Sequence, residues 1–271
     1  MLFQHSLSCL SRALSSLFFP PVCSFCNCAL EDPDNLVCEG CAESLRIIHH
    51  AVCRQCGMSH AGLAAEDDGL CGRCLAHPPR YERARFAVEY TGPLRDALIR
   101  FKFSGALHAG KGLGEILLAA FRRNYTAEEF DVILPVPIHP KRLAARGFNQ
   151  VAILGEKLSA ATGIALDRTS LKKIKDTPPQ VGLSRSERVA NLRGSFGISR
   201  PERIRGKSVL LIDDVATTGS TVAEAAKVIA RAKAARVTVL VLALRLAGSR
   251  AEVMPAETAT ANAEANYSEL Q

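Results

Sequence analysis

The sequence predicts an α/β fold with a parallel sheet, preceded by a small cysteine-rich domain. From about Tyr81, short β-rich runs alternate with longer helical patterns, which is typical of parallel strands joined by crossover helices. Before that point, eight of the ten cysteines form four C-x-x-C pairs. We therefore expect a short N-terminal helix (1–22), a cysteine-rich domain (23–80), an α/β domain (81–248) and a disordered tail (249–271).

Composition and charge are compatible with a soluble protein that binds an anion. The 271 residues are 48% hydrophobic and 23% charged, as in ordinary globular proteins with a sizeable core. The net charge is +7, and residues 170–207 alone hold ten Lys and Arg against three Asp and Glu. Such a local excess indicates where an anion would bind. No apolar run reaches the roughly 18 residues of a membrane span.

The N-terminal stretch LSCLSRALSSLFFPPVC (7–23) lacks the basic first region of a signal peptide and carries Arg12 in its middle. We expect a short amphipathic packing helix there, and a cytoplasmic protein. The last residues contain few large apolar side chains, which favours disorder.

The paired cysteines predict structural zinc. Each C-x-x-C turn points two thiolates at one ion, and two turns complete a closed tetrahedral site with no open position for substrate. Eleven residues separate the first pair from the second, and fourteen separate the third from the fourth, as in zinc ribbons. The expected ligands of one or two zinc ions are Cys23, Cys26, Cys38, Cys41, Cys53, Cys56, Cys71 and Cys74.

Two alternatives to zinc fit the sequence less well. A disulfide framework needs an oxidising compartment, and no secretory signal is visible. A thioredoxin-like redox pair would not require four pairs in about fifty residues. The spacing leaves open whether neighbouring pairs share an ion or whether the first pair joins the third. Of the two remaining cysteines, we expect Cys9 to be buried and Cys28 to lie near a metal ligand.

The α/β region is predicted element by element from its apolar runs. Ligands of such sheets bind at the carboxyl ends of the strands. One near-match to a phosphate loop, GALHAGKG (105–112), ends in Gly112 where a magnesium-binding hydroxyl is required, which argues against a nucleotide triphosphate site. The expected strands are 83–90, 130–138, 207–214 and 236–245, and the expected helices are 113–123, 149–163 and a helix from about Ser220.

The string VLLIDDVATTGST (209–221) predicts a sugar-phosphate site. Asp213 and Asp214 end a strand as two acceptors, which suits a vicinal diol that donates two protons. Gly219 permits a positive φ and close approach of backbone N–H groups to a phosphate, and the helix that follows adds its positive end. A helix N-cap after two solvated acids would explain one Asp and one hydroxyl, but not the whole string.

This string resembles the phosphoribosyl-diphosphate (PRPP) motif of type I phosphoribosyltransferases. The resemblance implies that Asp213 and Asp214 contact the ribose hydroxyls, and that Mg²⁺ arrives on the ribose and diphosphate oxygens. It also implies a type I phosphoribosyltransferase-like sheet. The residues that it assigns to the 5′-phosphate are Ala216, Thr217, Thr218, Gly219, Ser220 and Thr221.

Two further stretches narrow the resemblance. LPVPIHPKRLAARGFNQ (134–150) and TPPQVGLSRSERVANLRGSF (177–196) are similar to signatures of the ComF family, which comprises competence-related, amidophosphoribosyltransferase-like proteins. An N-terminal zinc domain also fits that family, especially its GntX-like branch. The resemblance extends from about Cys23 to Leu246 and implies a role in competence or DNA use.

In type I phosphoribosyltransferases a loop after an early strand binds diphosphate, and the resemblance implies this role for the first of these stretches. A strand ends at the prolines of 135–137, and Lys141, Arg142 and Arg146 follow as charge-assisted donors for the leaving group. A proline-rich turn with exposed basic residues is the alternative. His139 lies beside this loop, but one loop histidine is weak evidence for a general base.

The second stretch is basic and lacks a continuous apolar face. The family's hood loop implies a mobile lid over 172–193, with Arg185 and Arg188 as catalytic groups that stabilise the departing diphosphate. Closure of this lid would also exclude water. A solvated basic loop is the alternative.

Two functions therefore remain open. One is Mg²⁺-dependent transfer of a phosphoribosyl group to an amine or nitrogenous acceptor. The other is a PRPP-binding accessory protein without turnover, which binds single-stranded DNA in a salt-sensitive way and works with DNA-uptake proteins. The sequence does not identify the acceptor, and a homodimer is compatible with the fold.

Overall fold

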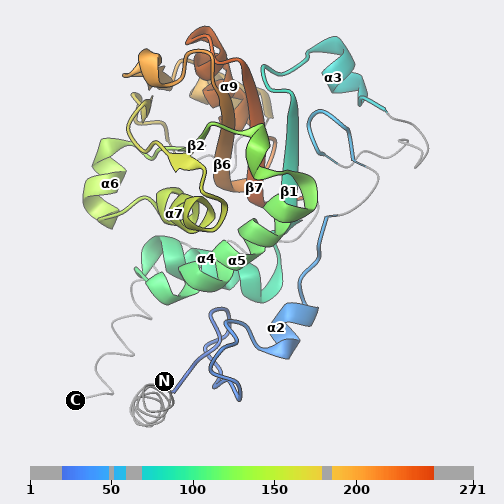
Figure 1. Cartoon of the computed structure of the whole chain (residues 1–271), viewed down its shortest axis with the longest axis vertical. Coiled ribbons are helices and arrows are strands. Elements are labelled where there is room, and N and C mark those ends of the chain that lie inside the picture. Colours follow the sequence, from blue (N-terminus) through green and yellow to red (C-terminus); the bar gives the residue numbers. More distant parts are fainter. Residues whose placement is uncertain (1–19, 49–51, 59–68, 179–184, 247–271) are drawn as a thin grey trace, which may run out of the picture.

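The computed structural model describes residues 20–48, 52–58, 69–178 and 185–246. Its centre is a parallel sheet in the order β1-β7-β6-β2-β3, flanked by helices (Figure 1). The predicted α/β class is therefore confirmed. The expected N-terminal helix, Cys9 and the expected disordered tail lie outside the described residues. The strands are β1 (Arg83–Glu89), β7 (Arg236–Leu244), β6 (Ser208–Ala216), β2 (Val132–Pro135) and β3 (Ala165–Leu166).

Helices cover both faces of the sheet, which is why its central strands are apolar throughout. Alternate side chains of β6 face opposite ways, so that Leu210 and Ile212 join one core cluster while Val209 and Leu211 join the other. Along β6 and β7 nearly every residue is buried. The first cluster contains α4 (Gly92–Phe103), α5 (Leu107–Asn124) and α7 (Gln150–Thr162), and the second contains α9 (Ser220–Arg231).

The stretch GALHAGKG (105–112), which resembles a phosphate loop in sequence, contains glycines that allow close packing of helices. GALHAGKG runs into α5, which begins at Leu107, earlier than the sequence predicts. A Cβ on Gly112 would lie 2.8 Å from the Cβ of Ser24, and one on Gly110 would lie 2.9 Å from the Phe101 ring. These glycines let α5 approach its neighbours closely, in agreement with the sequence-based argument against a phosphate loop.

Two helices frame the loop that follows β2. α6 (Pro140–Arg146) is capped by the Nδ1 of His139, which accepts a 3.3 Å hydrogen bond from the Lys141 backbone N–H. This short helix replaces the expected proline-rich loop, and it gives His139 a structural role. α7 starts after Asn149, whose side chain caps it, and ends at Gly163 with φ 75°, as predicted.

A small hood covers the carboxyl edge of the sheet near α9. It consists of the antiparallel strands β4 (Leu171–Lys173) and β5 (Phe196–Ile198) and the helix α8 (Arg185–Leu192). The expected lid thus contains a helix, which the sequence did not predict because its apolar pattern is weak. The backbone N–H of Gly194 donates to Glu224 Oε1 over 2.8 Å, which fastens the end of α8 to α9.

The two cysteine-rich segments pack against different parts of the fold (Figure 1). The first contains α2 (Glu39–Glu43) and buries Phe25 against α5. The second contains α3 (Gly72–Ala76) and contacts β1, where the Ala84 N–H donates to the Gln55 carbonyl over 2.7 Å.

Short 3₁₀ turns cover Ala127–Glu129 and Pro201–Arg203. Among the described helices, none has the length and apolarity to cross a membrane.

Candidate functional site

The turn between β6 and α9 is the centre of the candidate site. Asp213 and Asp214 are buried near the carboxyl end of β6, which continues to Ala216, two residues further than the sequence predicts, and α9 begins at Ser220. Gly219 joins them with φ 73°, a left-handed conformation that a side chain would strain. The hydroxyls of Thr218 and Ser220 lie 2.7 Å apart. The first N–H groups of a helix have no intrahelical partner, so those of α9 and the neighbouring hydroxyls together form a surface suited to a phosphate.

Asp214 is held by a network of polar side chains from three helices. Its Oδ2 forms an ion pair with Lys102 Nζ at 3.0 Å and accepts a hydrogen bond from Gln150 Nε2 at 2.6 Å. Gln150 Oε1 in turn accepts a 2.5 Å hydrogen bond from Arg146 Nη1, and the guanidinium of Arg146 lies 5.3 Å from the Phe103 ring centre. The charge of Asp214 is therefore balanced inside the protein.

Asp213 has a different environment from its neighbour. Its Oδ1 accepts the Asp214 backbone N–H at 2.9 Å, but no cation forms an ion pair with it among the described residues. Burial, and then the charge of Asp214, raise the pKa of Asp213 well above its usual range, while Lys102 and Lys173 oppose this rise. Below this raised pKa, Asp213 carries a proton that it can donate to an oxygen atom of a ligand.

Of the residues expected to bind diphosphate, Arg146 reaches the aspartate edge. All three lie on α6, but Arg142 donates to the Thr177 carbonyl at 2.6 Å, and both Lys141 and Arg142 lie 3.9 Å from the carboxylate of Asp176. The side chain of Lys141 is 80% exposed. On α6, therefore, Arg146 faces the buried aspartates, whereas Lys141 and Arg142 face the segment around Asp176 that follows β4.

The hood brings Arg188 onto the turn. Its Nη1 donates to the hydroxyl of Thr217 over 3.0 Å. Its Nε is buried and has no hydrogen-bond acceptor within the described part of the chain, so a donor remains for an anionic oxygen. Arg185 begins α8, but its side chain lies outside what the structure describes.

Three polar residues of this site carry no local sequence signal. Lys102 is one basic residue at the end of an amphipathic helix, and Gln150 follows a helix cap, so neither stands out in the sequence. Lys173 lies on β4 with its Nζ 5.5 Å from the Phe196 ring centre. Burial, and then Arg142, lower the pKa of Lys173, whereas Asp213 raises it. Only the fold shows that these side chains converge.

The cysteines form two clusters, each built from neighbouring pairs. The sulfurs of Cys53, Cys56, Cys71 and Cys74 all lie within 4.8 Å of one another, and so do those of Cys23, Cys26, Cys28 and Cys38. Sulfur atoms bound tetrahedrally at about 2.3 Å from zinc are about 3.8 Å apart. The separations of 3.8 Å in the second cluster and 3.7 Å in the first fit this geometry. The first pair therefore joins the second, and the third joins the fourth.

In each cluster, hydrogen bonds from backbone N–H groups lower the pKa of one thiol. Cys23 Sγ accepts from the N–H of Phe25 at 3.4 Å and from that of Cys38 at 3.3 Å, and Cys53 Sγ accepts from the N–H of Cys71 at 3.3 Å. Burial tends to raise these thiol pKa values, but the N–H groups outweigh it and lower the pKa of Cys23 and of Cys53 to about 6. Both groups thus favour the thiolate that binds zinc.

Five thiols surround the first metal position. Cys41 is buried and contacts the thiols of Cys23, Cys26 and Cys38, whereas Cys28 is exposed and contacts those of Cys26 and Cys38. The sequence predicts Cys41 as a ligand and Cys28 as a neighbour of the site. Since a tetrahedral ion takes four sulfurs, the first cluster has one thiol more than it needs.

Because of this extra thiol, we expect Cys26→Ser to retain two zinc ions per chain. Cys28 would then complete the ligand set with Cys23, Cys38 and Cys41. Atomic emission measurements on the purified protein give the zinc content, with Cys28→Ser as the control that also keeps two ions. The double variant Cys26→Ser/Cys28→Ser should lose zinc more readily to a chelator. Loss of one ion in Cys26→Ser alone would show that Cys28 cannot substitute.

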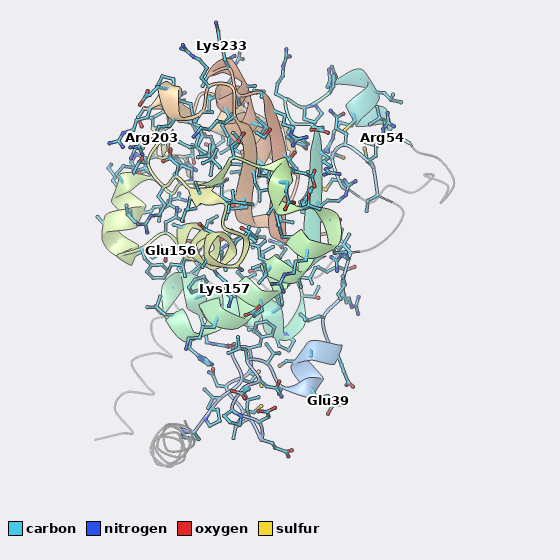
Figure 2. The ribbon with its side chains drawn as sticks, viewed as in Figure 1. Glu39, Arg54, Glu156, Lys157, Arg203 and Lys233 are labelled. Atoms are coloured by element: carbon cyan, nitrogen blue, oxygen red, sulfur yellow. The ribbon has the colours of Figure 1, made fainter. Side chains whose placement is uncertain are left out.

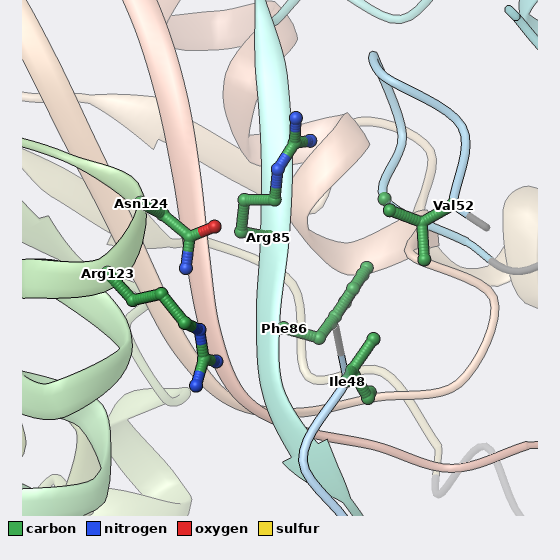
Figure 3. Close-up of a pocket in the computed structure, with 7 residues that line it drawn as sticks. Ile48, Val52, Arg85, Phe86, Arg123 and Asn124 are labelled. Atoms are coloured by element: carbon green, nitrogen blue, oxygen red, sulfur yellow. The ribbon is translucent and has the colours of Figure 1, made fainter. Parts of the chain in front are cut away.

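A cavity of about 290 Å³ is lined by residues of β1, α5 and the cysteine-rich segments (Figure 3). Arg85 comes from β1, Arg123 and Asn124 come from the end of α5, and apolar side chains line the other side. Arg85 is already engaged, since its Nη1 donates to the Arg54 carbonyl at 2.9 Å. None of the lining residues belongs to the segment from Asp213 to Thr221. The full lining is Ile48, Val52, Gly57, Arg85, Phe86, Arg123 and Asn124.

Comparisons with known families cover both parts of the chain. The double zinc ribbon domain family matches residues 14–75, which contain both cysteine clusters. The phosphoribosyl transferase domain family matches residues 117–266, which contain β2, β6, α9 and β7. The expected zinc-ribbon and phosphoribosyltransferase-like architecture is therefore confirmed.

Curated relatives match most of this chain. The DNA utilization protein YhgH of Salmonella typhimurium is 34% identical over 226 residues, which are 82% of this chain and 96% of the relative. Competence protein F of Haemophilus influenzae is 31% identical over 78% of this chain and 92% of its own length. Competence protein ComFC of Bacillus subtilis is 28% identical over 76% of this chain and 82% of its own length.

Proposed function

Since the chain belongs to the ComF family of phosphoribosyltransferase-like proteins, we propose that it binds PRPP with Mg²⁺ and transfers the phosphoribosyl group to an amine or nitrogenous acceptor. One observation carries this proposal. Two buried aspartates lie near the end of β6, and the turn that follows the strand leads through a left-handed Gly219 into α9. Acceptors for a diol and donors for a phosphate therefore lie on the same short turn.

The turn would bind the two ends of the ribose phosphate. Asp213 and Asp214 accept the hydroxyl protons of the diol, and the backbone and hydroxyls from Ala216 to Thr221 hold the 5′-phosphate. Mg²⁺, when bound with the substrate, would neutralise charge on the diphosphate oxygens. These contacts fix the sugar so that its C1 faces the space between β6 and the hood.

The leaving diphosphate would be bound by cations from three elements. Arg146 and Lys102 already lie next to Asp214, and Lys173 reaches toward Asp213 from the hood. As the C1–oxygen bond breaks, the diphosphate gains negative charge, which these cations stabilise. The acceptor nitrogen forms its bond to C1 and then loses a proton to water or to the departing diphosphate.

Arg188 links closure of the hood to substrate binding. In this structure it contacts Thr217, on the side assigned to the 5′-phosphate, and its Nε is available for another acceptor. A shift of α8 along the turn would bring the same guanidinium to the diphosphate. Exclusion of water by the hood protects the reactive sugar from hydrolysis.

Diphosphate release tests this proposal. We expect the protein with PRPP, Mg²⁺ and ammonia or candidate bases to release diphosphate only when an acceptor is present. Arg188→Ala should lower kcat/KM by about 10- to 100-fold, because a charge-assisted hydrogen bond is lost. Arg193→Ala is the matched control, since it removes an exposed arginine from the same hood. Equal rates for both variants would remove Arg188 from the mechanism.

An accessory role in DNA use is the second proposal. The relatives are named for DNA utilization and competence. The residues that line the arginine-containing cavity are not those of the turn, so a nucleic-acid strand bound there and PRPP would use different residues. Salt-dependent retention of single-stranded DNA, with PRPP binding but no diphosphate release, would favour this role. Acceptor-dependent release would favour the enzyme. Cysteines that bind zinc as thiolates fit a reducing compartment such as the cytoplasm.

A further inference from the structure

The second zinc ribbon, which spans Cys53 to Cys74, touches the phosphate-binding turn. Arg73 lies between the cluster cysteines Cys71 and Cys74, and its Nη1 lies 3.4 Å from the carbonyl oxygen of Thr218, toward which it donates. These two residues are 145 positions apart in the sequence. The contact therefore joins the metal-binding segment directly to the turn that follows Asp214.

A second contact lies one residue further along the same turn. Met58 is buried, and its Cε would be 3.4 Å from a Cβ placed on Gly219, so its methyl group packs against this glycine. Gly219 holds φ 73°, the conformation on which the direction of the following N–H groups depends. The ribbon thus contacts both the Thr218 carbonyl and the Gly219 backbone.

The ribbon is firmly attached to the sheet. Gly57 has φ 66°, and a Cβ there would lie 2.3 Å from the Ala84 carbonyl oxygen, so the ribbon backbone lies directly on β1. All four cysteines of the ribbon belong to the same core cluster as Ala216 and Val222, the residues on either side of the turn. The described residues of the second ribbon therefore connect the edge strand β1 to the turn.

The first ribbon, which spans Cys23 to Cys41, provides a contrast within the same chain. Its residue equivalent to Arg73 is Gly40, between Cys38 and Cys41, where a Cβ would meet nothing within 4 Å. Its packing involves α4 and α5, through contacts such as the 3.4 Å hydrogen bond that Ser24 Oγ donates to the His108 carbonyl. No hydrogen bond or ion pair found in the described ranges joins it to the turn.

We propose that the second ribbon holds the phosphate-binding turn in its binding conformation, with Arg73 and Met58 as positioning residues. This inference rests on the proposed PRPP site. A turn that is ordered before the ligand arrives pays less conformational entropy on binding. Without the ribbon contacts, Thr218 and Gly219 would sample other conformations, and their N–H groups would meet a phosphate less often.

Titration calorimetry with Mg²⁺–PRPP on the full chain tests the inference. We expect Arg73→Ala to raise the Kd about tenfold while the zinc content stays at the wild-type value. Arg54→Ala is the matched control, because it removes an exposed arginine from the same ribbon (Figure 2) and should leave the Kd unchanged. Arg73→Lys, which keeps the charge, should recover part of the affinity. A wild-type Kd for Arg73→Ala would overturn the inference.

Hydrogen exchange without ligand gives an independent readout. Amides from Thr217 to Ser220 should exchange faster in both Arg73→Ala and Met58→Ala than in Arg54→Ala. Met58→Ala leaves every cysteine and Arg73 in place, so it tests the contact even if Arg73→Ala loses zinc. If all variants exchange alike, the ribbon does not order the turn, whatever the PRPP titration gives. If the variants differ but the wild type gives no heat with PRPP, the proposed function fails and the ordering stands.

Discussion

Asp213→Asn is expected to weaken PRPP binding strongly and, at the same time, to stabilise the free protein. The loss of a carboxylate that accepts from the sugar diol should weaken binding by about 100-fold. In the free protein, however, Asp213 is buried and no cation pairs with it among the described residues. Asn keeps the acceptor for the Asp214 N–H and removes an ionisable group from the interior.

The stabilisation should depend on pH. The pKa of Asp213 is raised in the folded state by burial and by Asp214, so above about pH 4 the folded chain holds a proton that the unfolded chain has lost. The wild type therefore loses stability as the pH rises from about 4 toward the raised pKa, and Asp213→Asn does not. At pH 7.5 the variant should be more stable by at least about 1 kcal/mol, or about 2–4 °C in Tm.

Asp214→Asn is the control for this prediction. It also removes a carboxylate from the proposed diol site, but it breaks the ion pair with Lys102 and leaves that ammonium largely buried without its partner. This variant should lose both binding and stability. Thermal unfolding of the two variants between pH 5 and pH 8 checks the pair. A lower Tm for Asp213→Asn than for the wild type at pH 7.5 would contradict the assigned environment of Asp213.

Cys56→Ser is expected to remove one zinc ion and to destabilise the entire α/β domain. Cys56 is 1% exposed, and all four thiols of its cluster belong to the core that contains β1 and β7. No fifth cysteine contacts this cluster in the described part of the chain. Zinc binding contributes about 10 kcal/mol or more to the folding of small zinc-ligated segments, so its loss should lower the Tm by more than about 10 °C.

The equivalent substitution in the first ribbon, Cys26→Ser, distinguishes the effect of losing a zinc ion from the effect of losing a thiol. Cys26→Ser removes the second cysteine of its C-x-x-C pair, as Cys56→Ser does, but Cys28 is available there. Differential scanning calorimetry and zinc analysis of both variants should show a large Tm decrease and one lost ion only for Cys56→Ser. Equal Tm decreases in the two variants would mean that both ribbons contribute alike to the stability of the sheet.

The parts that the sequence predicts well are those encoded in consecutive residues. The string from Val209 to Thr221 contains the strand, the acidic pair, the turn glycine and the helix start, so its local structure follows from local chemistry. The C-x-x-C pairs are equally local. The helix from Asn149 to Gly163 is bounded by a cap and a left-handed glycine, both of which are readable from the sequence.

The parts that the sequence does not predict depend on contacts between distant segments. Lys102 lies near Asp214 only because α4 packs beside the sheet, and Arg73 reaches Thr218 only because the second ribbon packs on β1. The pairing of the cysteine motifs and the internal position of β7 also follow from tertiary packing. Such contacts leave no trace in spacing or composition.

Titration of Mg²⁺–PRPP into the wild-type protein tests the central claim most directly. If the turn from Asp213 to Thr221 binds the ribose diol and the 5′-phosphate together, calorimetry will show saturable heat at one site per chain. Ribose 5-phosphate should compete for that site, and proton release should increase below the raised pKa of Asp213. Absence of heat and of competition at millimolar PRPP would contradict the account.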